Sequence, residues 1–287
     1  MTSISVVLPV RDAVSLLGPC LDAVLGEATP DQVVVVDDGS TDGSAELAAA
    51  RGVSVLHAGG GGPYLARNLG WRHTSTELVA LTDVRCRPHP GWLDGLRAAM
   101  ADPAVAVAGG DVRALSGPGV AERYVAKWQP LAPEHGLGHP FLPFLPTCNL
   151  VTRRAVLEAV DGFREIRSGG DLDFCWRVQL AGLGTIAYAV GAGVDWVPRK
   201  TVAEVRRQWY RYGSAKPTLW ADYERHGLVV DPPKDLVRTV YDDGLELVRQ
   251  LRRSRFSQWD VALLGLLCQW EFRRGYRRQR KAVLSAR

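Results

Sequence analysis

The stretch LVALTDVRCRPHPGW, residues 78–92, ends an apolar run with Asp83 and places Arg85 two residues later. A carboxylate at the carboxyl end of a buried strand lies where open α/β sheets bind their ligands. A second acid two residues on would complete a site for a divalent metal, and Arg85 puts a cation there instead. Two interpretations remain open: Arg85 faces an anionic ligand, or it pairs with Asp83 and only fixes the loop.

A second group of acids ends the run VVVVDDGSTDGS, residues 33–44. The carboxylates of Asp37 and Asp38 can accept hydrogen bonds from ribose hydroxyls or from the imide N–H of a nucleobase. The simpler interpretation is that these acids form a turn with the Ser, Thr and Asp that follow. We assign one of the two acids to the turn and expect the other to bind a ligand.

A third acid, Asp171, follows Ser168-Gly169-Gly170 and opens a helical pattern over 169–182. The positive end of a helix favours an ionised carboxylate there. An ionised acid is what a general base requires. The alternative is that Asp171 only caps the helix, a role that Asp173 or Ser168 could also fill.

Alternating elements predict how these residues are positioned. Continuous apolar strands separated by helices favour a mostly parallel sheet covered on both faces. We expect strands over 4–10, 33–37, 53–58, 78–82 and 104–110, and helices over 15–25, 45–51, 63–71, 92–100 and 169–182.

The later part of the chain has a different pattern. Residues 116–146 are rich in Pro and Gly and predict a long irregular segment, and order resumes at 147–160. His135 and His139 fall in PEHGLGHPF, which predicts no helix and so no metal-binding pair. From about residue 201 onward the pattern is mostly helical. We therefore expect one domain over 1–225 and a helical, basic extension over 226–287.

Several function classes are disfavoured by the sequence. The first strand is followed by PVRDA, without the glycines of a dinucleotide-binding turn, and no Gly-Lys-Ser/Thr run is present. Five scattered cysteines predict reduced core residues rather than disulfides. The formal charge of +4 is concentrated after residue 225, on a mildly acidic body, which is not typical of a nucleic-acid-binding core.

The basic extension has its own alternatives. Residues 235–251 have an amphipathic pattern interrupted near Gly244, and the basic end contains Trp270, Phe272 and Tyr276. Such a surface can be a solvated face, a dimer contact or a peripheral contact with an anionic membrane. The longest apolar run, 261–270, is roughly half a membrane span. Because the amino terminus also has no signal-like segment, we expect a cytoplasmic protein that at most lies on a membrane surface.

Taken in order, seven stretches resemble family 2 glycosyltransferases of GT-A fold. The resemblance covers roughly residues 4 to 213 and implies a Rossmann-like, mostly parallel α/β sheet flanked by helices. It also implies inverting transfer of a sugar from a UDP-, GDP- or dTDP-sugar to an acceptor nucleophile, most simply a hydroxyl, that the sequence does not identify. The stretches are VVLPVRD, VVVVDDGSTDGS, GPYLARNLGW, ALTDVRCRPHPGWL, CNLVTRRAVLEAVDGFRE, GGDLDFCWRVQLAG and RRQWYRYG.

The resemblance also implies roles for individual residues. Asp171 resembles the family's catalytic base, and Asp83 the first acid of its Asp-x-Asp motif, which contacts the donor and can bind Mn²⁺ or Mg²⁺. Asn68 is expected to be structural. The implied donor-binding residues are Pro9 and Asp38 at the nucleobase, Asp37 in support, Arg67 near the phosphates or nucleoside, Asp83 at the ribose and sugar, and Arg85 and Arg211 near the diphosphate.

Three positions differ from the family pattern. Arg85 replaces the second acid of Asp-x-Asp, Gly170 replaces a Glu, and Asp195-Trp196 stands where a metal-binding His is common. A diphosphate leaving group can be stabilised by guanidinium groups instead of a cation. We hypothesise that Arg85, with Arg67 or Arg211, replaces part or all of the metal's role. The competing function is a catalytically inactive binding or scaffold module, and a nucleotidyltransferase is a weaker one.

Overall fold

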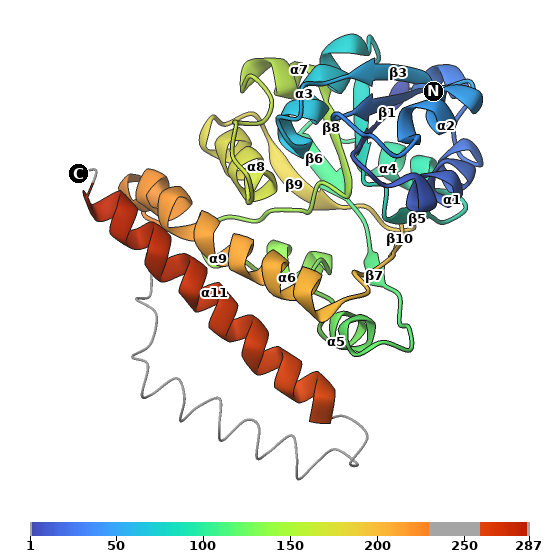
Figure 1. Ribbon diagram of the computed structural model, residues 1–287. Helices are drawn as coiled ribbons and strands as arrows, with labels where there is room; N and C mark the ends of the chain where they lie inside the picture. Colours follow the sequence, from blue (N-terminus) through green and yellow to red (C-terminus); the bar gives the residue numbers. More distant parts are fainter. Residues whose placement is uncertain (1, 230–258, 286–287) are drawn as a thin grey trace. The chain divides into compact units, whose positions relative to one another are not determined.

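A computed structural model describes residues 2–229 and 259–285 of the 287-residue chain. Contacts divide the chain into two compact units (Figure 1). The first unit comprises residues 1–114 and 129–197, and the second comprises residues 115–128 and 198–287. This division differs from the expected domain boundary after residue 225, which stays a prediction.

The first unit is built on a seven-stranded sheet in the order β3-β2-β1-β4-β8-β6-β9. Strands β1 to β4 run parallel to one another, and β6 and β9 are also parallel, whereas β8 is antiparallel to both of its neighbours. The predicted mostly parallel sheet is therefore confirmed. The strands are β1 Ile4–Val10, β2 Val33–Asp37, β3 Ser54–His57, β4 Leu78–Thr82, β6 Val105–Gly109, β8 Asn149–Arg153 and β9 Thr185–Tyr188.

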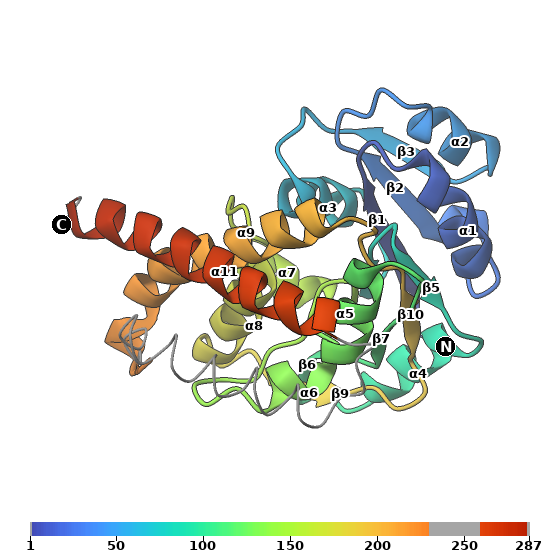
Figure 2. The same ribbon diagram turned by 60° about the horizontal axis from the view of Figure 1, so that its bottom comes forward.

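The core of this unit lies between the sheet and its helices. Every residue of β1, β2 and β4 is buried, as their continuous apolar runs predict for strands covered on both faces. Gly70 lets helix α3 lie close to the sheet, because a Cβ there would fall 2.4 Å from Val7 Cγ1. The flanking helices are α1 Val14–Leu25, α2 Ser44–Ala50, α3 Pro63–His73, α4 Trp92–Ala99, α7 Arg154–Ala159 and α8 Gly170–Leu180. Figure 2 shows α1 and α2 beside the β1–β3 end of the sheet.

A smaller three-stranded sheet follows the carboxyl end of β4. Its order is β5 (Cys86–Pro88), β10 (Val194–Trp196) and β7 (Val112–Ala114), with β10 antiparallel to β5 and parallel to β7. The backbone of Arg85 extends this pairing, because Val197 N–H donates to its carbonyl oxygen at 2.8 Å. The segment after Asp83 is therefore fixed by backbone pairing.

The expectation of an irregular segment over 116–146 is wrong in part. This range contains α5, Val120–Trp128, and the short α6, Pro133–Leu137. Helix α5 buries Ala121, Tyr124 and Val125, which recur at helical spacing that the surrounding Pro and Gly obscure. Pro133 opens α6, where the absent N–H costs nothing. His135 is therefore helical, contrary to the sequence prediction.

The second unit is helical in the part that the structure describes. Helix α9, Val202–Tyr223, begins at a capping box of Thr201 and Glu204, is followed by η2, Glu224–His226, and packs along α11, Trp259–Ser285. A Cβ at Gly213 would lie 1.9 Å from the Phe272 carbonyl oxygen, and one at Gly275 2.2 Å from that of Tyr210. These glycines allow the close crossing of α9 and α11, beside which α5 also lies (Figure 2).

Three further expectations can be compared with the structure. All five cysteines are buried with free thiols, as predicted. None of the helices in residues 2–229 and 259–285 is both long and apolar enough to cross a membrane. The amphipathic pattern over 235–251 lies outside the described residues.

Candidate active site

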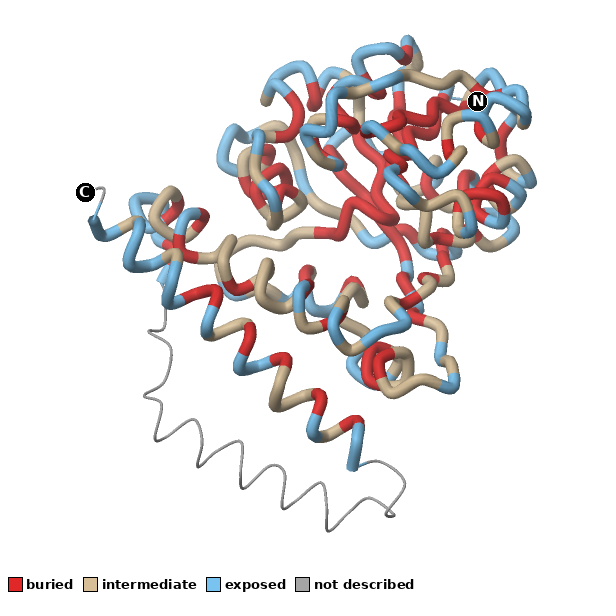
Figure 3. Tube along the Cα trace, in the orientation of Figure 1, coloured by how far each residue is buried: buried red, intermediate tan, exposed pale blue. Residues whose placement is uncertain are grey.

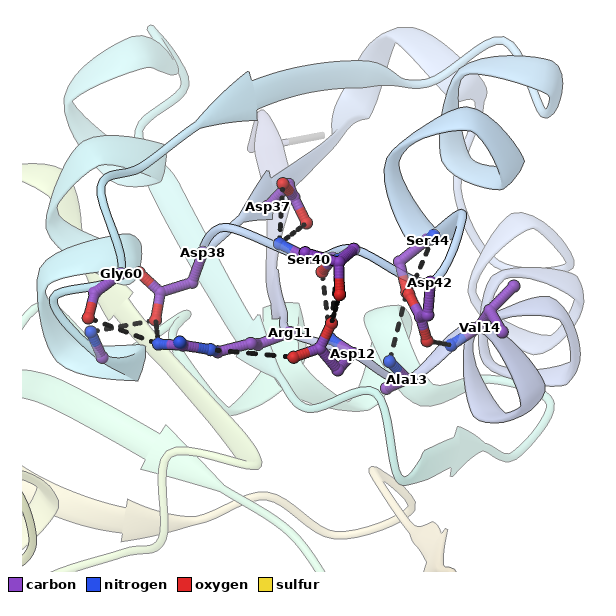
Figure 4. A network of polar contacts seen from close by, with 12 residues as sticks. Arg11, Asp12, Ala13, Val14, Asp37, Asp38, Ser40, Asp42, Ser44 and Gly60 are labelled. Carbon is purple, nitrogen blue, oxygen red and sulfur yellow. Dashed lines mark hydrogen bonds and ion pairs between the residues drawn. The ribbon is translucent and has the colours of Figure 1, made fainter.

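The two adjacent acids after β2 have different surroundings. Both carboxylate oxygens of Asp37 accept from the backbone N–H of Ser40, at 3.2 and 3.3 Å, so Asp37 forms the turn. Asp38 Oδ2 instead accepts from the N–H of Gly62 at 2.9 Å and lies 3.8 Å from Arg11 Nη1 (Figure 4). Of the two acids, Asp38 is the one left for a ligand.

Asp38 keeps one acceptor unused. Its side chain is buried, and Oδ1 has no hydrogen-bond partner within the described ranges. Leaving a charged acceptor buried and unsatisfied costs free energy, on the order of 1–3 kcal/mol or more. A ligand N–H or O–H that meets Oδ1 would recover this energy, so Asp38 is a candidate donor-recognition residue.

The loop that presents Asp38 is held by a polar network (Figure 4). Asp12 Oδ1 accepts from Thr41 N–H at 2.8 Å, and Asp42 Oδ2 accepts from Val14 N–H at 2.8 Å. Pro9 lies in the adjacent β1, paired in register with Val36, and the carbonyl of Val10 accepts from Asp38 N–H at 2.8 Å. The end of β1 and the turn after β2 therefore form one fixed platform.

A buried arginine meets the acid after β4. Arg67, on α3, is 2% exposed and donates from Nη2 to Asp83 Oδ1. Its guanidinium lies 5.5 Å from the centre of the Tyr64 ring, and its Nε has no partner among the residues described. Asp83 has 35% of its side chain exposed, so it presents a carboxylate to solvent while Arg67 anchors it.

Asp171 lies near this pair. It is the second residue of α8, half-buried, with Oδ1 accepting from the N–H of Leu172 at 3.1 Å. Burial raises the pKa of this carboxyl above its ordinary value, while the charge of Arg67 lowers it and that of Asp83 raises it. Because all three charges act on one another, Arg67, Asp83 and Asp171 form a single electrostatic cluster.

Two ion pairs of a buried acid fix the start of α8. Asp173 is fully buried between Arg164 and Arg177, each 2.8 Å away. Arg177 also donates to the carbonyls of Val160 and Gly162, both at 2.6 Å. Asp173 is therefore engaged within the fold. Within the described residues no side chain caps α8, whose N-cap is Gly169, so capping does not account for Asp171.

The Tyr64 ring leaves no room for a side chain at Gly170. A Cβ at Gly170 would lie 2.7 Å from two atoms of the Tyr64 ring, which is 8% exposed and stacked on Phe163. The ring thus fills the space that a Glu at position 170 would need. Sequence reasoning missed Tyr64, although it lies in the stretch GPYLARN.

Asn68 has the structural role that the sequence indicated. Its side-chain amide donates to the carbonyl of Phe163 at 2.6 Å, and its Oδ1 accepts from the N–H of Phe163 at 2.9 Å. Trp71 Nε1 donates to the same oxygen at 3.0 Å. Asn68 therefore ties α3 to the loop that leads into α8.

Asp195 lies on β10 of the smaller sheet, and Arg85 lies directly before β5 of the same sheet. Arg85 is half-buried and donates from Nη1 to the carbonyl of Val197 at 3.2 Å. Asp195 binds Arg113 at 2.9 Å and His89 at 3.1 Å. Burial raises the pKa of Asp195, but these two hydrogen bonds outweigh it and hold the pKa below its ordinary value.

The side chains available as metal ligands suit only a cation that has few protein ligands. No group of three or more His, Cys, Asp or Glu that could hold a metal occurs in the described part of the chain. The side chain of Asp83 is partly exposed, and Mg²⁺ is often held by one or two carboxylates together with substrate phosphates. Asp83 with a bound diphosphate therefore fits a divalent cation.

Arg211 belongs to the second unit. It is half-buried on α9, one residue before Tyr212, whose hydroxyl accepts from Gln208 at 2.6 Å. The other predicted site residues all lie in the first unit, and five of them, at positions 9, 37, 38, 83 and 85, lie on or just after the carboxyl ends of β1, β2 and β4.

Comparisons with known proteins agree with this architecture. The sequence model described as "Glycosyl transferase family 2" matches residues 5–160. The chain is 32% identical over 218 residues to the pre-mycofactocin glycosyltransferase of Mycobacterium tuberculosis, a match that covers 69% of this chain and 45% of that protein. The chain thus spans about half the length of this relative.

Two solved structures share the fold. One is the mannosyltransferase PcManGT of Pyrobaculum calidifontis in complex with GDP-Man and Mn²⁺, at 18% identity and a TM-score of 0.60, covering 98% of this chain and 83% of that one. The other is glucosyl-3-phosphoglycerate synthase of M. tuberculosis with Mn²⁺, UDP-Glc and phosphoglyceric acid, at 21% identity and a TM-score of 0.56, covering 80% and 81%.

Proposed function

Because the chain belongs to glycosyl transferase family 2, we propose that it is an inverting glycosyltransferase that uses a nucleoside-diphosphate sugar. The observation that carries this proposal is the cluster of Arg67, Asp83 and Asp171, which combines a cation, a partly exposed acid and an acid of raised pKa. The neighbours named above bind GDP-Man or UDP-Glc, which supports a donor of this class.

Donor binding starts at the turn after β2. Asp38 Oδ1 would accept the imide N–H of the base, since it is buried and has no partner within the described residues. The Gly62 N–H and Arg11 keep this carboxylate oriented. Pro9 and Asp37 would support the same pocket through the backbone of β1 and the turn. Asp83 would contact the ribose and sugar, and Arg67, already paired with Asp83, would bring positive charge near the phosphates.

Asp171 would act as the general base. Its raised pKa makes it a stronger base than an ordinary Asp, and the amino end of α8 still favours the charged form. Asp171 would take the proton of the acceptor hydroxyl as the oxygen attacks the anomeric carbon, and the bond to the diphosphate breaks on the opposite side. The sugar is then transferred with inversion, and proton removal contributes about 10²–10⁴-fold to the rate.

Charge on the leaving diphosphate must also be stabilised. If a divalent cation is bound, Asp83 and the phosphate oxygens would hold it, and the cation would neutralise that charge. Arg67 and Arg85 would share this role. Turnover that survives EDTA, and is lost in Arg85→Gln, would support the arginine contribution. An absolute requirement for Mn²⁺ would refute it.

The experiment for the proposed function is donor hydrolysis. UDP-, GDP- and dTDP-sugars are screened by thermal shift with and without Mn²⁺, and the best donor is then assayed for release of the nucleoside diphosphate. We expect Asp171→Asn to lower the rate by about 10²–10⁴-fold. Asp161→Asn is the matched control, because Asp161 is exposed and pairs only with the exposed Arg72 among the contacts described.

Two results would contradict the proposal. A hydrolysis rate that is unchanged in Asp171→Asn would show that Asp171 is not the general base. Donor binding without any turnover, in the presence of varied acceptors and cations, would favour the inactive binding or scaffold module.

A further inference from the structure

Helix α11 has two faces of different character. One face packs against α9 and α5 and buries Val261, Leu264, Cys268, Gly275 and Tyr276 (Figure 3). The opposite face contains large apolar and basic side chains. We call it the outer stripe, and its residues at helical spacing are Leu263, Leu266, Trp270, Arg274, Arg277, Lys281 and Leu284.

The apolar residues of the outer stripe gather in its first half. Leu263 is 57% exposed and Trp270 is 51% exposed. A leucine and a tryptophan on the same side of one helix are thus exposed to water. Burying their apolar surface would be favourable. Tryptophan is also the residue that prefers the boundary between water and a lipid bilayer.

The second half of the outer stripe is basic. Arg277 and Lys281 are exposed one turn apart, and Arg274, which stacks on Trp270 at 5.6 Å, links the two halves. Between residues 261 and 285 the sequence has one acid, Glu271. Glu271 is 5% exposed and pairs with Arg206 of α9 and, at 3.4 Å, with Arg274, so among the contacts described its charge is taken by these two arginines rather than by Arg277 or Lys281.

We propose that the outer stripe of α11 docks on the surface of an anionic lipid membrane. Trp270 and Leu263 would enter the interfacial region, and Arg274, Arg277 and Lys281 would contact the negatively charged headgroups. The helix would lie along the surface, since no described helix is long and apolar enough to cross a bilayer.

A second copy of the chain fits this stripe less well. A parallel pair of stripes would place Arg277 and Lys281 against the same cations of the partner. An antiparallel pair would place these cations against Leu263 and Trp270, away from water and near Asp260, which already pairs with Arg123. Each arrangement buries charge that stays unpaired, which is costly. An anionic surface complements both halves at once.

Vesicle sedimentation of the full chain tests this proposal without any donor. The protein is mixed with vesicles of phosphatidylcholine alone, or with added phosphatidylglycerol, at low and at physiological salt. We expect binding only to the anionic vesicles, weaker at higher salt. Arg277→Glu/Lys281→Glu should weaken binding roughly 30-fold or more, given the contribution of each cation near an anionic surface. Leu263→Gln/Trp270→Gln should also weaken it.

The matched control is Lys200→Glu/Arg225→Glu, which changes the charge equally at two exposed cations of the same unit outside α11. This control should bind like the parent chain. The proposal is overturned if the parent chain does not bind anionic vesicles, or if the control loses as much affinity as the stripe variant. It is also overturned if the stripe variants only change the oligomeric state in analytical ultracentrifugation. Circular dichroism establishes that each variant is folded.

Discussion

The contact between Gly170 and Tyr64 gives a prediction whose size follows from the structure. A Cβ at Gly170 would lie 2.7 Å from Tyr64 Cε1 and Cζ, well inside normal contact distance. The ring cannot move aside easily, because it stacks on Phe163 at 5.8 Å and is 8% exposed. We therefore expect Gly170→Ala to lower the free energy of unfolding by about 1–3 kcal/mol, the usual cost of overpacking.

A double-mutant cycle separates this collision from other effects. Tyr64→Ala alone should cost about 3–5 kcal/mol, as for other buried aromatic side chains. In the Tyr64→Ala background the added methyl group has room, so Gly170→Ala should cost about 1–3 kcal/mol less than in the parent chain. Urea unfolding followed by circular dichroism measures each step.

The control substitution is Gly59→Ala. No atom lies within 4 Å of a Cβ built at Gly59, and its backbone is not left-handed, so the change should stay within about 0.5 kcal/mol. Equal penalties for Gly170→Ala in both backgrounds would refute the reasoning, as would a Gly170→Ala variant as stable as the parent chain.

Three further predictions concern the candidate site. Since the active form of Asp171 is ionised and its pKa is raised, kcat/KM for donor turnover should fall as the pH drops through a value above the ordinary carboxyl range. Arg67→Gln should move this acid limb of the pH profile to higher pH, and Asp83→Asn should move it to lower pH. An acid limb that stays in place in both variants would show that Arg67 and Asp83 do not act on the pKa of the base. Asp171→Asn should raise the midpoint of thermal unfolding at neutral pH, because ionising the parent Asp171 in the folded state is unfavourable; this advantage should shrink as the pH falls toward the ordinary carboxyl pKa, and a destabilised variant at neutral pH would contradict it. Asp38→Asn should weaken donor binding about tenfold to a hundredfold in calorimetry while the chain stays folded, since a hydrogen bond to a charged acceptor is lost.

The sheet was largely predictable from the sequence, because its central strands are continuous apolar runs. The runs that form Val33–Asp37 and Leu78–Thr82 are visible in the sequence, and every residue of both strands is buried in the fold. The antiparallel direction of β8 was not predicted, since a run of apolar residues does not indicate which way a strand points. Helix α5 was missed because Pro and Gly on either side dominated the composition of residues 116–146.

The site residues were found by type, but their pairing was not. The residue pattern by itself left Asp37 and Asp38 equivalent, and only the family resemblance assigned the nucleobase to Asp38. In the fold, the N–H of Gly62, 24 residues away along the chain, donates to Asp38, whereas Asp37 accepts from Ser40. Arg85 was the nearest cation to Asp83 in sequence, yet the fold brings Arg67 onto that carboxylate. Contacts of this kind depend on how α3 lies on the sheet, which local patterns do not specify.

The absence of a Glu before Asp171 has a similar explanation. In the sequence, Gly170 is only a departure from the family pattern. In the fold it is a consequence of Tyr64, 106 positions earlier, whose ring takes the space. Which side chain fits at position 170 thus depends on a residue that lies far away in the sequence.

The configuration of the first product tests the central claim most directly. If Asp171 deprotonates a nucleophile that displaces the diphosphate in one step, the sugar must leave with inverted configuration. Proton NMR of the hydrolysed donor, recorded before the anomers equilibrate, reports this configuration. We predict that an α-linked nucleotide sugar yields the β-anomer first. An α-anomer as the first product would contradict direct displacement and the role assigned to Asp171.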